Sequence, residues 1–280
     1  MKSLLLAAIL LIGISSSAQY YYKDIVGTKE TSELIKSYMK NKVSRVMLNS
    51  YDADDTKSDN LFVQQEFSPQ SRVLKTTTAT GGDNGNSSIL FTYADEKGNI
   101  VKTVDSSGIV VSTTSYSYDG AGNLTLVSIS SSDTTVSESE QHVWQWENGK
   151  PSKMLRIRNN RDTTYVNFKL DDNGNVSEET ATHKKVADIP YDYYYNEKNQ
   201  LTDVVRYNER AKQPLPEYMF EYSSSNQVIQ KITVPTNNSD YLIWRYQYNP
   251  QGLKVKEVVY SKHDKKTPMG KVEYQYSFVQ

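Results

Sequence analysis

The sequence predicts an all-β fold: an antiparallel repeat meander of about sixteen strands that forms an open spiral or a barrel-like shell. Three observations predict it. A turn motif recurs eight times, its copies are 24 to 27 residues apart, and apolar residues alternate along the flanking segments. A fixed period of this length indicates a repeat architecture. Since each repeat supplies two strands, eight repeats supply about sixteen.

The repeated turn is clearest at Tyr118–Leu124, which reads YDGAGNL. Its first turn position is Asp, Asn or Ser, whose side chain can accept a hydrogen bond from the backbone two residues on. Its fourth position is mostly Gly or Asn, the residues that enter the left-handed region most easily. The fourth positions are Ser71, Gly98, Gly122, Gly149, Gly174, Asn199, Asn226 and Gly252. A type I turn followed by a left-handed residue connects the strands of a β-hairpin.

The segments on both sides of the turns alternate between apolar and polar residues. Tyr191, Tyr193 and Tyr195 precede one turn, and Leu124 and Leu126 follow another. This alternation predicts strands with one buried face. The last copy departs from it, because Lys254 occupies the usual apolar position. A β-propeller, with two repeats in each four-stranded blade, is the alternative architecture.

The motif at Tyr118–Leu124 resembles the consensus of YD repeats, which occur in exported RHS-type bacterial proteins. The resemblance extends weakly over roughly Tyr51 to Phe278. It implies a long antiparallel sheet that curls into a shell, and a small secreted member of the family. It implies no particular activity.

The first eighteen residues have the pattern of a secretory signal peptide. Lys2 supplies the positive start, Leu4 to Ile14 the apolar core, and Ser16 to Ala18 a small-residue cleavage site. We therefore expect an exported protein, located in the periplasm, on the cell surface or outside the cell.

Two further segments complete the predicted domain organisation. Residues 19–44 form an N-terminal segment, in which Glu30 to Asn41 has apolar residues at helical spacing. This short amphipathic helix is expected to cover an open end of the sheet, as terminal caps do in repeat proteins. Residues 45–280 form the YD-like repeat domain.

Composition excludes several classes of function. The chain has no cysteine, so disulfides and thiol chemistry are excluded. Its net charge of −1 lacks the basic excess expected of a nucleic-acid-binding protein. A mean hydropathy of −0.66, with no apolar run after the signal, predicts no transmembrane helix in the mature chain.

No catalytic, cofactor or metal site is predicted. The three histidines lie in different repeats and have no metal-ligand spacing. Carboxylates on strands, such as Glu221 and Glu257, are interpreted as the polar residues of the alternating pattern, which face solvent. We therefore expect a protein that is not an enzyme and has no cofactor.

The predicted function is an exported scaffold or protein-interaction module, which pairs with a partner through the exposed terminal strand Val272–Phe278. The expected partners are cell-envelope proteins or polysaccharide. One alternative is a carbohydrate-binding module, in which aromatic side chains stack on sugar rings rather than packing across strands. Its platform residues are Tyr118, Trp146, Tyr195, Tyr222, Trp244 and Tyr248. A weaker alternative is an outer-membrane barrel.

Overall fold

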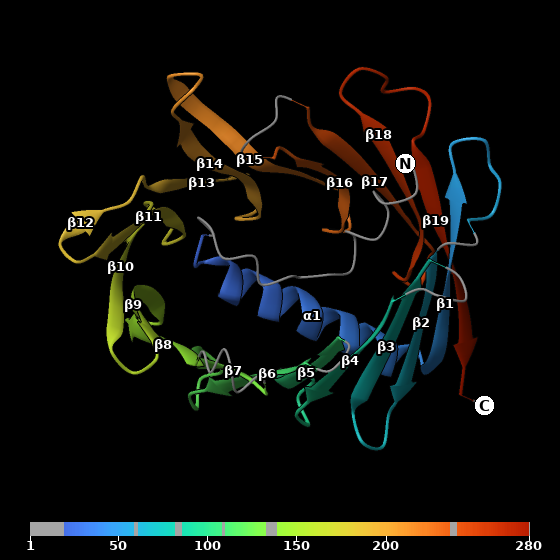
Figure 1. The fold of residues 1–280 in the computed structure, drawn as a ribbon, viewed down its shortest axis with the longest axis horizontal. Helices are drawn as coiled ribbons and strands as arrows, with labels where there is room; N and C mark the ends of the chain where they lie inside the picture. The colour runs from blue at the N-terminus through green and yellow to red at the C-terminus, as the bar shows by residue number, and fades with distance from the viewer. Residues whose placement is uncertain are drawn as a thin grey trace.

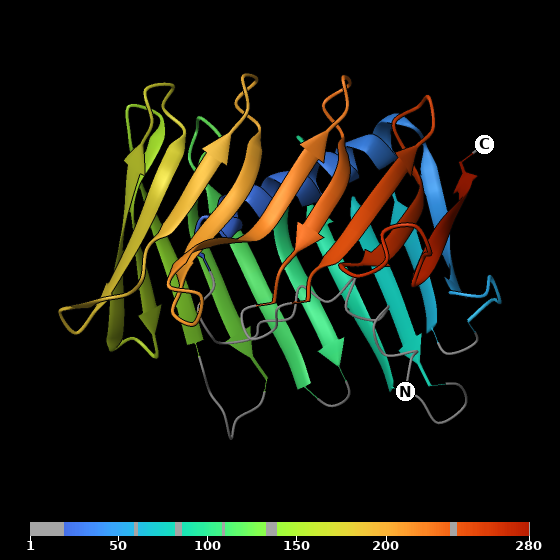
Figure 2. The same ribbon diagram turned by 90° about the horizontal axis from the view of Figure 1, so that it is seen from above.

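The protein is a closed antiparallel β-barrel with a helix inside it (Figures 1 and 2). A computed structural model describes residues 20–279 except 59–60, 82–85, 108–109, 133–138 and 236–239. The predicted signal peptide, residues 1–18, lies outside these residues. Within the described part of the chain, no helix has the length and apolarity that a membrane span requires.

The strands alternate with short turns along the whole repeat domain. They are β1 (Val43–Asp52), β2 (Leu61–Ser68), β3 (Val73–Thr80), β4 (Asn86–Ala94), β5 (Ile100–Ser107), β6 (Val110–Tyr118), β7 (Leu124–Ser131), β8 (Ser139–Glu147), β9 (Lys150–Arg158), β10 (Asp162–Leu170), β11 (Val176–His183), β12 (Val186–Ala187), β13 (Tyr191–Tyr195), β14 (Leu201–Asn208), β15 (Gln213–Tyr222), β16 (Val228–Thr233), β17 (Leu242–Tyr248), β18 (Lys254–Ser261) and β19 (Gly270–Phe278).

The barrel closes through the two ends of this series. β1 pairs with β2 on one side and with β19 on the other, both antiparallel. β12 pairs with β11 alone, so 18 of the 19 strands form the ring. The predicted all-β, barrel-like shell is confirmed. The alternatives of an open spiral and of a propeller are wrong, because one continuous sheet closes on itself.

The strand count differs from the predicted sixteen because β1 and β19 flank no copy of the turn motif. The eight motif turns connect β2 through β11 and β13 through β18. β1 and β19 come from opposite ends of the described chain and complete the ring. β19 pairs with β1 along its whole length, but with β18 only from Gly270 to Glu273. The expected free edge is therefore absent at Val272 and Glu273, whereas the residues from Tyr274 to Phe278 pair with β1 alone among the described strands.

The turns have the predicted geometry. In the Tyr118–Leu124 copy, Asp119 Oδ1 accepts hydrogen bonds of 2.9 Å from the backbone N–H groups of Ala121 and Asn123. Gly122, at the fourth position, has a φ of 87°. Seven of the eight fourth positions have a positive φ. In the first copy the positive φ belongs to Arg72, one residue after Ser71.

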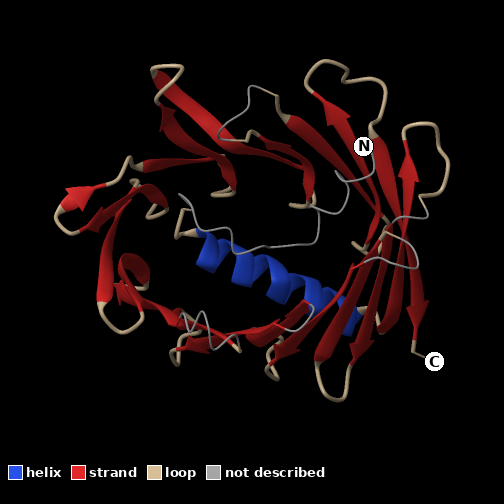
Figure 3. Ribbon diagram, viewed as in Figure 1, coloured by secondary structure: helices blue, strands red, loops and turns tan. Residues whose placement is uncertain are grey.

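The helix α1 spans Lys23–Lys40 and runs through the barrel interior (Figure 3). The predicted helix begins seven residues too late, at Glu30. Gly27 and the β-branched residues before Glu30 have low helix propensity, and packing inside the barrel overrides it. The expectation that this helix covers an open end of the sheet is wrong, because the sheet has no open end.

One face of α1 packs against the barrel wall. Thr28, Ser32, Ile35 and Tyr38 form its buried stripe, spaced at three or four residues. The Ser32 hydroxyl accepts a 3.2 Å hydrogen bond from the backbone N–H of Ile100, at the start of β5. The Tyr38 hydroxyl donates a 2.6 Å hydrogen bond to Gln65 Oε1 on β2. These bonds fix the helix against one side of the wall.

Two apolar clusters fill parts of the interior. One joins Ile35 and Tyr38 of α1 to β1–β5 and to the last two strands. The other joins the residues around the helix start to β7–β14, and includes Trp144 stacked on Phe168 with ring centroids 5.1 Å apart. Neither cluster has a fully buried member on β15, β16 or β17.

Candidate functional site: the luminal cluster

The aromatic residues of the predicted carbohydrate platform belong to the barrel wall. Tyr118, Trp146, Tyr195, Tyr222 and Tyr248 are half-buried, and Trp244 is 9% exposed. Five of the six donate a hydrogen bond to another strand, four to a backbone carbonyl and Trp244 to the Thr233 hydroxyl, through a polar atom that a sugar would otherwise use. The platform itself stays a prediction.

The pre-turn aromatic makes the same bond in several repeats: it donates to the carbonyl of the first strand residue after the preceding turn. Tyr118 donates to Ile100 O, Trp146 to Leu124 O, Tyr222 to Leu201 O and Tyr248 to Val228 O, at 2.7–2.9 Å. Tyr276 of β19, which precedes no motif turn, makes the equivalent 2.7 Å bond to Lys254 O. Burial raises the pKa of Tyr222 to about 12, which keeps its hydroxyl protonated and able to donate. The pre-turn aromatic residue therefore connects one hairpin to the preceding hairpin by a hydrogen bond.

The face of α1 opposite the buried stripe is directed toward β15–β18 on the other side of the barrel interior (Figure 1). Glu30 and Leu34 lie one turn apart on this face, away from the buried stripe. Leu34 is 37% exposed and Glu30 is also exposed, although the helix runs inside the barrel. Water therefore reaches this side of the helix. We call the residues that face it the luminal cluster: Glu30, Tyr218, Lys231, Tyr246, Lys254 and Glu257.

Lys231 is the most unusual member of the luminal cluster. Its ammonium lies 5.2 Å from the ring centroid of Tyr218 and 5.8 Å from that of Phe220, the cation–π range. Among the described residues, no carboxylate lies within 4 Å of this ammonium, and the side chain is only half-buried. Lys231 therefore presents a positive charge to water on the inside of the barrel.

Lys254 and Glu257, two further members of the luminal cluster, form an ion pair with each other. Lys254 Nζ lies 2.5 Å from Glu257 Oε1, and the Tyr274 hydroxyl donates to the same oxygen at 2.6 Å. Glu257 is 3% exposed, so the interpretation of this residue as a solvent-facing alternate is wrong, whereas Glu221 is exposed. Glu257 Oε2 is buried and accepts no hydrogen bond from the described residues. The pair leaves one carboxylate oxygen unsatisfied.

The charges of the luminal cluster influence one another across the interior. Although water reaches Glu30, its place inside the barrel partly desolvates the carboxylate and raises its pKa, and the positive charges of Lys231 and Lys254 oppose this rise. Burial lowers the pKa of Lys231; the charge of Glu30 raises it and that of Lys254 lowers it. The charges of Glu30 and Lys231 thus act on each other, yet the two side chains make no ion pair within 4 Å in the described structure.

Two tyrosines of the luminal cluster differ from the pre-turn tyrosines. Tyr218 and Tyr246 lie within β15 and β17, and their hydroxyls make no hydrogen bond to any described residue. Neither hydroxyl is among the buried polar atoms that lack a partner, and both rings are half-buried. Their hydroxyls are therefore open to water and free to bind a ligand.

A second cluster of polar side chains, which we call the anchor, contacts the start of α1. It consists of Asp24, Glu140, His142, Arg156 and Glu179. His142 Nδ1 lies 2.6 Å from Asp24 Oδ2, and its Nε2 lies 2.8 Å from Glu140 Oε1. Arg156 donates to the other Glu140 oxygen at 2.7 Å. Although burial opposes it, hydrogen bonds and charge from Asp24 and Glu140 raise the pKa of His142 to about 9. With both ring nitrogens donating, His142 has no lone pair with which to act as a general base.

Glu179 completes this anchor. Its carboxylate accepts 2.8 Å hydrogen bonds from the backbone N–H groups of Tyr21 and Tyr22 and from the Tyr193 hydroxyl. Burial raises the pKa of Glu179 to about 7, against the effect of these hydrogen bonds. A carboxylate at a helix N-terminus is stabilised by the helix dipole, so Glu179 fixes where α1 begins.

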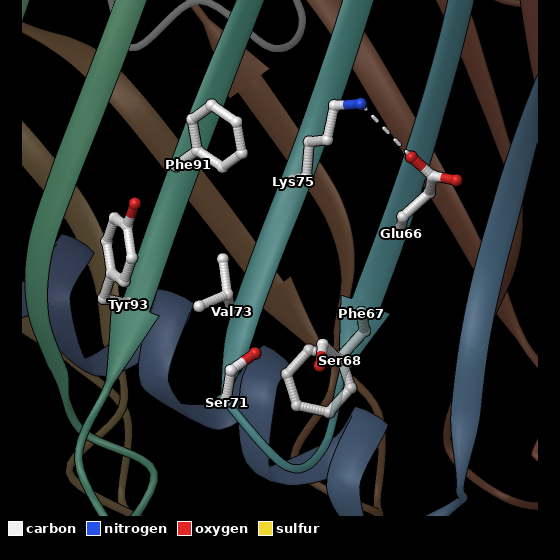
Figure 4. Close-up of a pocket in the computed structure, with 8 residues that line it drawn as sticks. All are labelled: Glu66, Phe67, Ser68, Ser71, Val73, Lys75, Phe91 and Tyr93. Atoms are coloured by element: carbon white, nitrogen blue, oxygen red, sulfur yellow. Dashed lines mark hydrogen bonds and ion pairs between the residues drawn. The ribbon is translucent and has the colours of Figure 1, made fainter.

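A shallow groove of about 370 Å³ lies on β2–β4 (Figure 4). Val73, Phe91 and Tyr93 supply its apolar floor, and Lys75 pairs with Glu66 at 3.4 Å beside them. Across the described residues, no group of three or more His, Cys, Asp or Glu side chains is placed to hold a metal ion.

A family model described as RHS Repeat matches residues 94–136, which contain the turns at Asp95 and Asp119. The chain carries an RHS repeat. The predicted YD-type resemblance is thereby confirmed for this segment of the barrel. No curated protein matches the sequence.

Solved structures similar to this barrel share little sequence with it. A porin-like protein from Bacteroides uniformis is 10% identical with a TM-score of 0.40, over 85% of this chain and 97% of that chain. The TcdB2-TccC3-Cdc42 structure is 13% identical with a TM-score of 0.34. The Photorhabdus luminescens Tc holotoxin pore is 11% identical with a TM-score of 0.34. The two toxin matches cover 77% and 78% of this chain, and 11% and 12% of those chains.

The luminal cluster was missed from the sequence, although one signal of it was visible. Lys254 stands at a position of the repeat where an apolar residue is usual, and that position faces inward. Lys231 gave no such signal. Its place opposite inward-facing Trp244 depends on the strand register, which the repeat alone does not determine.

Proposed function

We propose that this RHS-repeat barrel is an exported, non-enzymatic scaffold that binds a small polar ligand in its interior, at the luminal cluster. One observation carries the proposal: four interior groups of this cluster are partly exposed and make no hydrogen bond or ion pair with any described residue. They are the carboxylate of Glu30, the ammonium of Lys231 and the hydroxyls of Tyr218 and Tyr246. Polar groups buried only for stability are normally paired.

Each of the three histidines is held by carboxylate partners, and none of them belongs to the luminal cluster. His142 is occupied on both nitrogens, and His183 and His263 pair with Asp162 and Asp240 at 2.6 and 3.0 Å. A carbohydrate ligand is compatible with the luminal cluster. It would use the hydroxyls of Tyr218 and Tyr246 rather than the fastened pre-turn tyrosines.

The burial pattern of β10 disfavours the outer-membrane alternative. Along β10, Tyr165, Asn167 and Lys169 point outward and are exposed, whereas Val166 and Phe168 point inward and are buried. Outer-membrane barrels carry an apolar band on the outside and polar residues within. The pattern on β10 is the reverse.

The proposal is tested by measuring whether reagents enter the interior. Because the chain has no cysteine, a single introduced thiol reports its own position. Leu34→Cys is expected to react with a small charged thiol reagent, whereas Ile35→Cys, at a position 0% exposed, is expected to be protected. Tyr165→Cys, at an outer position 57% exposed, is the positive control.

The expected order of reaction rates is Tyr165→Cys, then Leu34→Cys, with Ile35→Cys far slower. Equal protection at positions 34 and 35 would show that the interior is closed to solutes, and the proposed function would then be wrong.

A further inference from the structure

The luminal cluster contains two oppositely charged groups without ion-pair partners. Lys254 is neutralised by Glu257 at 2.5 Å. Glu30 lies on the face of α1 opposite its buried stripe, Lys231 lies over the rings of Tyr218 and Phe220, and neither has an ion-pair partner within 4 Å among the described residues. Each of the two groups can therefore accept a ligand group of the opposite charge.

We infer that the ligand is a small zwitterion bearing an ammonium and a carboxylate, of the amino-acid or short-peptide class, with the ammonium at Glu30 and the carboxylate at Lys231. This inference rests on the proposed function, because it requires a ligand inside the barrel.

Charge balance distinguishes this class from a simple anion or cation. With Glu30, Glu257, Lys231 and Lys254 ionised, the four side chains carry no net charge. A monoanion bound at Lys231 would place a second negative charge opposite Glu30, in surroundings where an unpaired charge is costly. A zwitterion satisfies both groups and leaves the interior neutral.

The surrounding hydroxyls match the remainder of such a ligand. Tyr218 lies against Lys231, whose ammonium is 5.2 Å from its ring centroid, and Tyr246 lies on the neighbouring strand β17. Both hydroxyls can donate to and accept from an amide or carboxylate. The Lys231 and Lys254 ammonium groups lie over the rings of Tyr218 and Tyr246, at 5.2 and 4.5 Å. These ring faces are occupied, which disfavours stacking of a neutral sugar there.

The inference is tested by calorimetry with four probes: the dipeptide Ala-Ala, its N-acetyl form, its C-terminal amide and the neutral disaccharide maltose. The free dipeptide is expected to bind at least about 10-fold more tightly than either blocked form, because each block removes one charge-assisted contact. N-acetyl dipeptide binding as tightly as the free dipeptide would overturn the inference in favour of an anion site.

Variants of the barrel test whether Lys231 and Glu30 are the groups that bind the carboxylate and the ammonium of the ligand. Lys231→Met is expected to abolish the preference for the free carboxylate over the amide, and Glu30→Gln the preference for the free ammonium over the acetyl form. Lys256→Met removes a lysine from the other face of β18, where it lies 3.9 Å from Glu273, and should change neither preference. Unchanged preferences in the Lys231 and Glu30 variants would also overturn the inference.

The calorimetric and thiol experiments together distinguish a failure of the zwitterion inference from a failure of the proposed function. If Leu34→Cys reacts but the dipeptide does not bind, the interior is open and only the zwitterion inference is wrong. If Leu34→Cys is protected, the proposed function is wrong as well.

Discussion

Replacing His142 by glutamine tests the anchor that holds the start of α1. In the folded protein the pKa of His142 rises from 6.5 to about 9, since the hydrogen bonds and charges of Asp24 and Glu140 outweigh burial. A tenfold change in proton affinity corresponds to about 1.4 kcal/mol, so the charged ring stabilises the fold by about 3 kcal/mol relative to the neutral ring. Glutamine keeps a polar side chain but has no proton to lose.

The sign of the pH dependence follows from linkage. Because the folded pKa lies above the unfolded value, the stabilisation by His142 is complete below pH 6.5 and is lost as the pH rises through 9. The difference in unfolding free energy between wild type and His142→Gln should therefore be largest at pH 6 and fall by about 3 kcal/mol by pH 10.

Urea unfolding followed by tryptophan fluorescence measures this difference, because Trp144 lies beside the anchor with its Nε1 3.4 Å from Asp24 Oδ2. His263→Gln is the matched control, since His263 pairs with Asp240 at the surface, where its side chain is 73% exposed. A wild-type-minus-variant difference that stays constant from pH 6 to pH 10 would refute the reasoning.

Three further changes test the wall and its closure. Tyr222→Phe removes the 2.7 Å hydrogen bond to the Leu201 carbonyl and should lower the free energy of unfolding by about 1 kcal/mol in urea titrations; no change would show that the bond does not fasten the hairpins. Gly122→Ala should cost about 1–2 kcal/mol because of its φ of 87°. Gly120→Ala, where an added Cβ meets nothing within 4 Å, should cost clearly less, and equal costs would contradict the turn argument. Deleting β19 (Gly270–Phe278) should make α1 accessible to limited proteolysis, whereas cleavage no faster than in wild type would show that the barrel does not need this strand.

The sequence allowed the repeating hairpins to be predicted because turn chemistry is local. Asp119 and Gly122 determine the geometry of their own turn, and the same residue types recur in most copies. Closure was not predictable in this way, because the pairing of Val46 with Tyr276 joins segments that have no motif in common. The curvature that brings these segments together comes from the twist of the whole sheet.

The candidate site depends on the same long-range information. Glu30 was recognised only as an acidic residue of a short helix, and its meaning changed once that helix was found inside the barrel. Glu257 looked like an ordinary outward alternate until the register placed it opposite Tyr246, on the inner face. Charged residues on the inside of a repeat barrel are therefore visible in the sequence only when they replace an apolar residue of the motif, as Lys254 does.

The pairing of β1 with β19 imposes an order of assembly on the protein. β19 follows every other strand along the chain, so the ring stays open until the last strand has been made. α1 precedes every strand and must already lie against the growing sheet when the ring is sealed. Contacts between such distant segments form slowly. An incomplete chain would expose both unpaired strand edges and the apolar interior, so full-length synthesis itself protects the protein from aggregation.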